Sequence, residues 1–226
     1  MTLAEVLCIR PGVTAVIGGG GKTSLLRALG EELAGNGHTV ILCTTTKIFP
    51  FPGLRNLTEG GKVEISVALA ERPLLCLGTP VPGTGKLTAP GLPMEALANL
   101  AEYVLAEADG AAGRPMKAHA PYEPVIPTEV NQVICVVGAS GFGRPISAAA
   151  HRPERYAALA GAALDAPVTP ELAAAVLRSE GLHDRIFVNQ AETAERLAAA
   201  KQLQKMLPCP MAAGALRQEG GHLLCW

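Results

Sequence analysis

VTAVIGGGGKTS, residues 13–24, decides the fold class of this chain. Its apolar, β-branched first half predicts a strand over residues 13–18, and four glycines complete the turn that follows. Residues 22–37 predict a helix that ends at Gly35 or Gly37, with an apolar stripe formed by Leu25, Leu26, Leu29 and Leu33. A strand, a glycine turn and a helix in this order are typical of a phosphate-binding loop.

The glycine loop has the chemistry that phosphate binding requires. Glycines expose backbone N–H groups without side-chain bulk, and the N-terminus of a helix carries partial positive charge. Val16 stands where the common GxxxxGK(S/T) pattern has glycine, so the loop is of a shorter GGxGKT type. The alternative is a flexible turn followed by an ordinary lysine. In such a loop Lys22 reaches the outer phosphates and the Thr23 hydroxyl binds Mg²⁺. The residues predicted to bind a nucleotide here are Gly18, Gly19, Gly20, Gly21, Lys22, Thr23 and Ser24.

Two further predicted strands end in polar residues. Residues 38–46 read HTVILCTTT and residues 103–109 read YVLAEAD, and helical segments alternate with strands along the chain. This alternation predicts an α/β fold, a P-loop NTPase-like three-layer sandwich with a mainly parallel sheet. Ligands of such sheets bind at the carboxyl ends of the strands.

Acidic and hydroxyl side chains at these strand ends are the candidates for metal binding and catalysis. Asp109 is predicted to bind Mg²⁺ and to act in catalysis with Lys22, and Glu107 to orient the attacking water. A strand-ending turn is the alternative for Asp109. The residues after the second strand are also predicted to bind a ligand: magnesium, the γ-phosphate or a second substrate. They are Thr44, Thr45, Thr46 and Lys47. The alternative is that this run simply ends a strand, since threonine is a good strand former.

Residues 110–127 form a proline-rich segment for which no regular structure is expected. Prolines hold a loop extended at low entropic cost, which suits the positioning of charged groups over a site. Arg114 and Lys117 are predicted to contact the ligand, with His119 and Glu123 beside them. Solvated loop decoration is the alternative.

Asn189 and Glu192 follow the predicted strand at residues 185–189. Their spacing resembles the NKxD motif with which GTPases bind guanine, although glutamine and glutamate replace its lysine and aspartate. Capping of the next helix is the alternative. Further helices are predicted at 153–163, 170–180 and 192–206, and further strands at 132–138, near 210–213 and near 222–226.

The composition excludes several function classes. A balance of 19 Lys plus Arg against 20 Asp plus Glu provides no basic field for nucleic acid or anionic lipid, and only 4% of residues are aromatic. No apolar stretch approaches the ~18 residues of a membrane-spanning helix. The six cysteines are scattered singly, as in a reducing cytosol, so we expect a cytoplasmic protein. One domain over residues 1–226 is predicted, with loops and small strands at about 47–100.

Six segments together resemble one family. IGGGGKTSLL, CTTTKI, AEADGAAGRPMKAHAPYEPVIP, VVGASGFGRPI, HRPE and VNQAE are similar, in order and spacing, to the YqeC family of accessory proteins for selenium-dependent molybdenum hydroxylases. The similarity extends over about residues 10–195. It implies a role in selenium cofactor biosynthesis, with a molybdenum hydroxylase or a selenium or molybdenum cofactor factor as partner.

Three activities fit these residues. The first is Mg²⁺-dependent hydrolysis or transfer of a phosphate of ATP or GTP, which depends on positioning and charge neutralisation. The second is that of a small-molecule kinase or ATP-dependent ligase, in which residues 44–47 bind the acceptor. The third is binding of a phosphate-bearing cofactor without hydrolysis.

Overall fold

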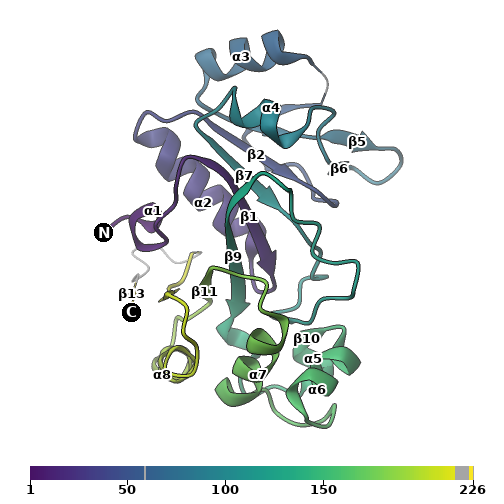
Figure 1. Ribbon diagram of the computed structural model, residues 1–226, viewed down its shortest axis with the longest axis vertical. Coiled ribbons are helices and arrows are strands. Elements are labelled where there is room, and N and C mark those ends of the chain that lie inside the picture. Colours follow the sequence, from purple (N-terminus) through teal and green to yellow (C-terminus); the bar gives the residue numbers. More distant parts are fainter. Residues whose placement is uncertain (59, 217–223, 226) are drawn as a thin grey trace.

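The computed structural model describes residues 1–58, 60–216 and 224–225, which form a nine-stranded sheet. The strand order is β13-β12-β11-β9-β1-β7-β2-β4-β3, and all neighbours are parallel except β12 and β13. This arrangement confirms the predicted α/β fold with a mainly parallel sheet (Figure 1). The strands are β1 (Gly12–Gly18), β2 (Val40–Thr44), β3 (Arg55–Leu57), β4 (Leu74–Leu77), β7 (Tyr103–Glu107), β9 (Val130–Gly138), β11 (Arg185–Asn189), β12 (Met211–Ala213) and β13 (Leu224–Cys225).

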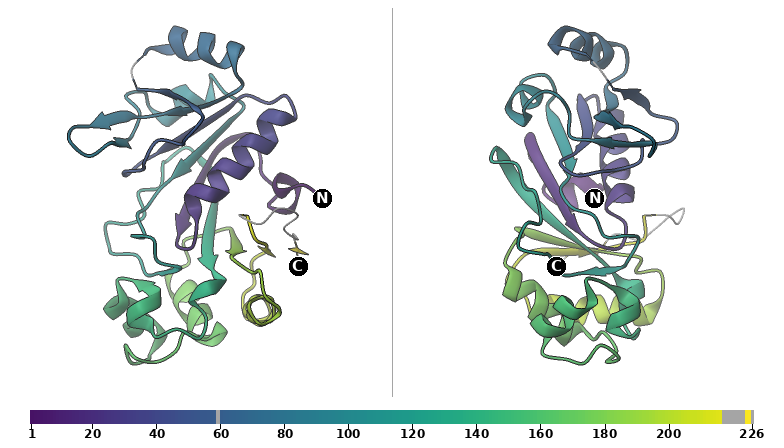
Figure 2. Two further views of the ribbon diagram at one scale, coloured as in Figure 1. Left: turned by 180° about the vertical axis from the view of Figure 1, so that it is seen from behind. Right: turned by 90° about the vertical axis from the view of Figure 1, so that its right-hand side faces the viewer.

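Helices cover both faces of this sheet, because its strands are apolar on both sides. In β1, Val16 packs on one face with α1 (Leu3–Val6) and α2 (Lys22–Gly35), whereas Ala15 and Ile17 face the other. Figure 2 shows α2 lying across the first face. The opposite face is covered by α3 (Lys62–Glu71) and α4 (Met94–Ala98) at one end, and by α5 (Ile146–Ala149), α6 (Pro153–Ala160), α7 (Pro170–Glu180) and α8 (Ala194–Gln204) at the other.

The predicted elements around the glycine loop are confirmed. The structure places β1, α2, β2, β7, β9, β11 and the three later helices α6, α7 and α8 where the hydrophobic pattern predicts them, with ends that differ by a few residues. Of the predicted last strand, residues 222, 223 and 226 lie outside the described residues. The local pattern was therefore sufficient to find most of the sheet.

The prediction of loops and small strands at 47–100 is wrong for two parts of that segment, residues 62–71 and 94–98, which form the helices α3 and α4. Residues 62–71 form α3, although Val63 and Val67 are β-branched and exposed. The helix is favoured because Ile65, Ala68 and Leu69 bury one face against the sheet. At its start, the Glu64 carboxylate accepts a hydrogen bond from the Gly61 N–H at 2.9 Å.

Two small strand pairs lie outside the central sheet. β5 (Thr79–Val81) and β6 (Lys86–Thr88) form an antiparallel hairpin, and Ile48 pairs with Leu87 beside it. β8 (Met116–Lys117) pairs with β10 (Ala150–His151), so the proline-rich segment holds two residues of regular structure where none was predicted. A 3₁₀ turn, η1 (Ala139–Gly141), follows β9.

The carboxyl ends of the central strands meet at one edge of the sheet. Glu107 of β7 is in register with Val16 of β1 and Thr44 of β2. Asn189 of β11 is in register with Gly138 of β9. Neighbouring strands lie about 4.8 Å apart, so the polar groups that follow them gather within a few strand widths. Across the described part of the chain, the helices are too short or too polar to cross a membrane.

Candidate phosphate-binding site

A cavity of about 570 Å³ opens at this edge of the sheet. Its walls are residues 20–24 of the glycine loop and α2, residues 47–49 after β2, residues 110–114 after β7, and, at and after the end of β11, Asn189, Gln190 and Glu192. Lys86 of β6 and Glu107 of β7 complete it. The cavity therefore lies where ligands bind in open α/β sheets.

The backbone N–H groups of the glycine loop fall into two sets. Those of Gly18, Gly19 and Gly20 donate to Asp109 Oδ2 at 2.8 Å, to the Val136 carbonyl at 2.9 Å and to the Arg114 carbonyl at 3.0 Å. Those of residues 21–24 have no acceptor among the residues that the structure describes, and the first bond into the helix runs from Leu25 N–H to the Gly21 carbonyl at 3.0 Å. Four adjacent donors at a helix N-terminus are therefore available to an anion.

Asn189 orients the first of these donors. Its Nδ2 donates to the Gly20 carbonyl at 2.8 Å, and its Oδ1 accepts from the Leu216 N–H at 3.3 Å. Because a trans peptide is planar, the N–H of Gly21 points away from the carbonyl of Gly20. The buried Asn189 side chain thus fixes the peptide between Gly20 and Gly21, with the Gly21 N–H pointing away from Asn189.

Glycine is required in the loop by close packing as well as by backbone angle. At Gly20, φ is +82° and a Cβ would lie 2.3 Å from Cα of Gly138. At Gly21, φ is +116° and a Cβ would lie 2.5 Å from Nδ2 of Asn189. The glycines therefore let the loop pass against the ends of β9 and β11 while its conformation stays left-handed.

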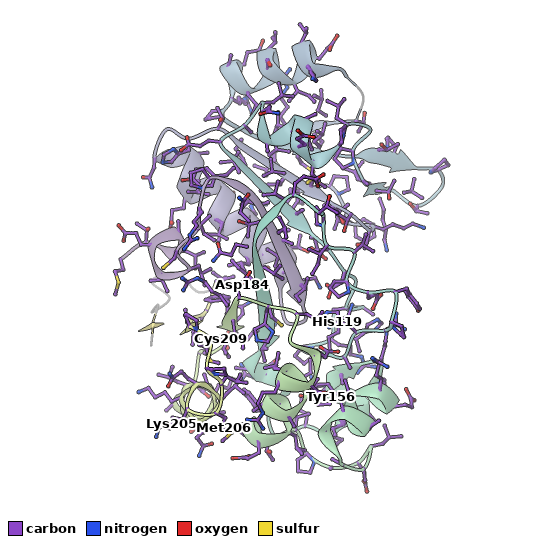
Figure 3. The ribbon with its side chains drawn as sticks, in the orientation of Figure 1. His119, Tyr156, Asp184, Lys205, Met206 and Cys209 are labelled. Carbon is purple, nitrogen blue, oxygen red and sulfur yellow. The ribbon has the colours of Figure 1, made fainter. Side chains whose placement is uncertain are left out.

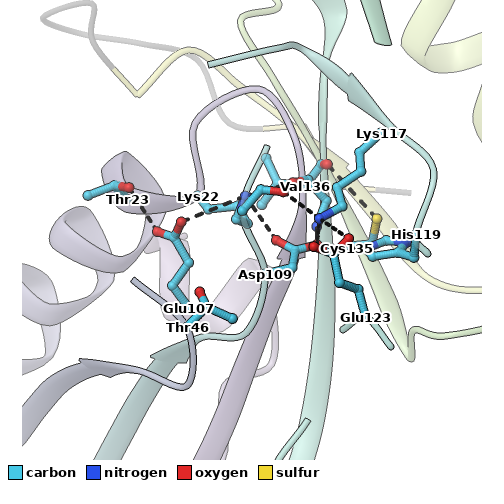
Figure 4. Close-up of polar contacts among 12 residues, drawn as sticks. Lys22, Thr23, Thr46, Glu107, Asp109, Lys117, His119, Glu123, Cys135 and Val136 are labelled. Atoms are coloured by element: carbon cyan, nitrogen blue, oxygen red, sulfur yellow. Dashed lines mark hydrogen bonds and ion pairs between the residues drawn. The ribbon is translucent and has the colours of Figure 1, made fainter. Parts of the chain in front are cut away.

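Lys22 is buried between two carboxylates. Figure 4 shows its Nζ between Asp109, whose Oδ1 is 3.0 Å away, and Glu107, whose Oε1 is 3.7 Å away. Nζ also donates to the Gly18 carbonyl at 2.7 Å. Lys22 still lines the cavity, and it is one of the four residues, 21–24, whose backbone N–H groups are free among the described residues.

Glu107 and Asp109, the two predicted carboxylates, have different surroundings. Glu107 lines the cavity and accepts from the Thr23 hydroxyl at 2.8 Å. Burial raises the pKa of Glu107, and Lys22 and Thr23 offset only part of this effect. Asp109 is fully buried beneath the loop and is not among the residues that line the cavity.

Asp109 is the centre of a buried ionic network. Its Oδ2 accepts from His119 Nε2 at 2.6 Å and lies 3.2 Å from Lys117 Nζ. Burial opposes ionisation, but the hydrogen bond from His119 and the ammonium groups of Lys22 and Lys117 lower the pKa of Asp109 to about 2. Asp109 is therefore an ionised anchor for the loop and for three cationic side chains.

The network extends through His119 to α7. His119 Nδ1 lies 2.8 Å from Oε2 of Glu180, the last residue of α7, and its backbone N–H donates to Oε1 at 2.6 Å. Figure 3 shows His119 beside α7. Burial lowers the pKa of His119, but hydrogen bonds to Asp109 and Glu180 outweigh it and raise the pKa above its usual value. Because both ring nitrogens face carboxylates, both donate, and the ring is an imidazolium.

Lys117 connects the network to the proline-rich segment. Its Nζ lies 3.1 Å from Oε2 of Glu123, whose Oε1 is 3.0 Å from Arg152. Burial opposes ionisation of Glu123, but these two cations lower its pKa below the usual value. The predicted ligand contact of Lys117 stays a prediction, since its side chain is fully buried and already paired.

The threonines at and after the end of β2 bond to neighbouring segments. Thr44 Oγ1 donates to the Glu107 carbonyl at 2.8 Å, and Thr45 Oγ1 donates to the Val125 carbonyl at 2.7 Å. The Thr46 carbonyl accepts from Thr88 Oγ1 at 2.7 Å. Lys47, but none of these three threonines, is among the residues that line the cavity.

Arg114, Asn189 and Glu192 line the cavity as predicted binding residues, but each already has an internal partner. The guanidinium of Arg114 donates to the Ala148 carbonyl, and Glu192 pairs with Arg196 at 2.6 Å. Base recognition by Asn189 and Glu192 therefore stays a prediction.

Phe49, Lys86 and Glu180 were not predicted as part of the site. Phe49 and Lys86 line the cavity, with Nζ of Lys86 5.0 Å from the centroid of the Phe49 ring. The FPFPG segment and the TGK sequence read as loop punctuation, and no local signal brings them together. Glu180 ends a helix far from the glycine loop in sequence, so only the packing of α7 places it near Asp109.

Comparisons with known proteins match the part of the sequence that builds this site. A model of the YqeC protein family matches residues 14–154, which include the glycine loop, Glu107, Asp109 and the proline-rich segment. The chain is also 31% identical over 221 residues to the uncharacterized protein YqeC of Escherichia coli (strain K12), covering 88% of this chain and 83% of that protein. The chain therefore belongs to the YqeC family.

Proposed function

We propose that this protein binds a nucleoside triphosphate with Mg²⁺ at the N-terminus of α2 and hydrolyses it or transfers its terminal phosphate. One observation carries the proposal. The N–H groups of residues 21–24 have no acceptor in the described part of the chain and border a 570 Å³ cavity together with Lys22 and Thr23. Such a set of donors at the start of a 14-residue helix suits a phosphate group.

In this proposal, the metal is held by Thr23 and Glu107. The Thr23 hydroxyl and the Glu107 carboxylate are in hydrogen-bond contact at the cavity wall, and oxygen donors of these two kinds suit Mg²⁺. Mg²⁺ bound with a nucleotide usually takes only one or two protein ligands besides phosphate and water. Direct binding by Asp109, as predicted from the sequence, requires that it leave Lys22, Lys117 and His119.

Lys22 supplies the positive charge for the outer phosphates. Its Nζ lies near two carboxylates, so a phosphate in the cavity competes with them for the ammonium. Mg²⁺ neutralises the phosphates and polarises the bond to the leaving oxygen when it is bound. Residues 110–113 line the same cavity after β7.

Calorimetric titration with ATP, GTP and their diphosphates, with and without Mg²⁺, tests the proposal. We expect Lys22→Ala to weaken nucleotide binding roughly 10- to 100-fold, since it removes a charge-assisted contact. Lys62→Ala is the matched control, because Lys62 also follows two glycines and opens a helix, α3, yet does not line the cavity. Equal binding by both variants contradicts the proposal.

Turnover separates hydrolysis from binding alone. We expect phosphate release that requires Mg²⁺ and that falls in both Glu107→Gln and Thr23→Ala. Firm nucleotide binding with phosphate release at background would instead favour a binding protein for a phosphate-bearing cofactor.

The pathway in which the nucleotide is used is a separate part of the proposal. The family resemblance supports a role in selenium cofactor biosynthesis or in maturation of a selenium-dependent molybdenum hydroxylase. We expect nucleotide turnover to rise when the hydroxylase lacking its cofactor is added. No change in turnover and no association of the two proteins would contradict this part alone.

A further inference from the structure

The cavity has two halves, one on each side of the glycine loop. Along the sheet edge the order is β11-β9-β1-β7-β2, with the loop after the middle strand. Asn189 ends β11 and is followed by Gln190 and Glu192, and residues 47–49 come after β2. Both strands lie two strand spacings, or about 10 Å, from β1. A nucleotide with its phosphates on α2 and its base toward β11 leaves the β2 half for something else.

We propose that Lys47, Phe49 and Lys86 form a second subsite, in which a flat ring molecule that carries an anionic group binds beside the nucleotide phosphates. The inference rests on the proposed function and deepens it, because it names the chemical class of a second small molecule that binds beside the nucleotide. Phe49 supplies the surface for the ring, and the two lysines supply the charge.

The side chains of this subsite are available to a ligand. Phe49 is 62% exposed and lines the cavity, so its ring is accessible to a ligand there. Neither Lys47 nor Lys86 has a carboxylate partner within the residues that the structure describes. Lys86 instead lies over the Phe49 ring, 5.0 Å from its centroid. An aromatic face beside unpaired ammonium groups suits stacking of a planar ring and binding of its anion.

The fold holds these side chains together. Ile48 and Leu87 exchange two backbone hydrogen bonds of 3.0 and 2.8 Å, which join the segment after β2 to the β5–β6 hairpin. The bond of 2.7 Å from Thr88 Oγ1 to the Thr46 carbonyl adds a third link. Figure 1 shows the hairpin beside the end of β2. Phe49 and Lys86 are therefore each next in sequence to a residue of this hydrogen-bonded pair. Because the backbone is already held in place, little conformational entropy of the chain is lost when a ligand binds.

A second cation–aromatic pair in the molecule provides the comparison. The Arg152 guanidinium lies 5.4 Å from the centroid of the Tyr122 ring, which is 71% exposed. Arg152 is already paired with Glu123, and neither residue lines the cavity. The pair of Lys86 and Phe49 therefore differs in two respects: its cation lacks a carboxylate, and it faces the nucleotide site.

Flavin mononucleotide is a suitable probe, because it is flat, anionic and fluorescent. The full-length protein is first saturated with ADP and Mg²⁺ and then titrated with the probe, with riboflavin as the matched molecule that lacks the phosphate. We expect flavin mononucleotide to bind more tightly than riboflavin. We expect Phe49→Ala and Lys86→Gln each to weaken its binding about tenfold, the size usual for loss of one stacking or ionic contact.

Tyr122→Ala is the control, and we expect it to bind the probe as the wild type does. No detectable binding of the probe to the ADP-saturated protein, or the same affinity in Phe49→Ala and wild type, overturns the inference. So does a loss of ADP affinity in Phe49→Ala, because the ring would then contact the base of the nucleotide.

Failure of the proposed function gives a different result. If ADP and ATP do not bind, or bind without need of Lys22, the nucleotide site is refuted. Titration of the protein with flavin mononucleotide alone then still tests the subsite, by the same difference between Phe49→Ala and Tyr122→Ala. Circular dichroism and thermal unfolding check that each variant is folded.

Discussion

Nζ of Lys22 and Oδ1 of Asp109 lie 3.0 Å apart beneath the glycine loop, and both side chains are buried. The same carboxylate bonds the Gly18 N–H with its other oxygen, at 2.8 Å. Asp109 thus fixes both the start of the loop and the lysine that the loop presents. Lys117 and His119 contact the same carboxylate, so Asp109 pairs with three cationic side chains, counting Lys22.

Asp109→Asn is expected to reduce the free energy of unfolding by about 3–5 kcal/mol, because it removes the buried carboxylate that Lys22, Lys117 and His119 share. Urea unfolding at pH 7 measures this loss. The matched control is Glu31→Gln, which breaks an exposed pair with Arg27 of 2.8 Å and is expected to cost about 0.2–1 kcal/mol. Equal losses would show that the buried network contributes no more than a surface pair.

His119 is expected to make the free energy of unfolding fall as the pH rises above about 6.5. Burial lowers the pKa of His119, but Asp109 and Glu180 outweigh this effect and raise the pKa above its usual value of 6.5 in the folded protein. The stabilisation is therefore fully present below about pH 6.5 and is lost as the pH rises through the folded-state pKa. Urea unfolding from pH 6 to pH 9, at roughly constant ionic strength, follows this change.

His119→Gln is expected to flatten that dependence on pH. The control His38→Gln removes a half-exposed imidazole beside Glu102 and is expected to keep the slope of the wild type. A wild-type slope that persists in His119→Gln would assign the dependence to other groups.

Gly20→Ala is expected to destabilise the protein more than Gly37→Ala. Both glycines have positive φ, +82° and +90°, so both variants incur about 1–2 kcal/mol of backbone strain. Only at Gly20 does the new Cβ collide with the backbone, at Gly138, whereas Gly37 has open space. The difference, expected at roughly 1–3 kcal/mol from overpacking, is measured by urea unfolding. Equal effects would mean that the loop can move away from β9.

Asn189→Ala is expected to weaken ATP and GTP binding by the same factor. Its Nδ2 holds the Gly20 carbonyl, so its loss frees the peptide that aims the Gly21 N–H, whichever base is bound. Calorimetry with both nucleotides measures the two factors. A loss confined to GTP would instead support base recognition by Asn189, as the NKxD-like spacing suggests.

The sequence by itself determined the elements whose signals are local. The apolar run before the glycines, the leucine stripe after them and the alternation of strands and helices were enough to predict β1, α2 and a parallel sheet. The positions of Glu107 and Asp109 near one strand end also followed, because side chains near the end of a strand stay near the sheet edge.

Only the tertiary structure decided which of these groups face the cavity and which form hydrogen bonds or ion pairs within the protein. Asn189 reaches Gly20 across 169 residues of sequence, and His119 reaches Glu180 across 61. Phe49 meets Lys86 because Ile48 pairs with Leu87. Such contacts depend on strand order, register and helix packing, which bring distant segments together because apolar surface is buried between them. Local secondary-structure propensity does not predict which segments will meet. The physical division is therefore between backbone preference, which is local, and the competition of buried polar groups for partners, which is not.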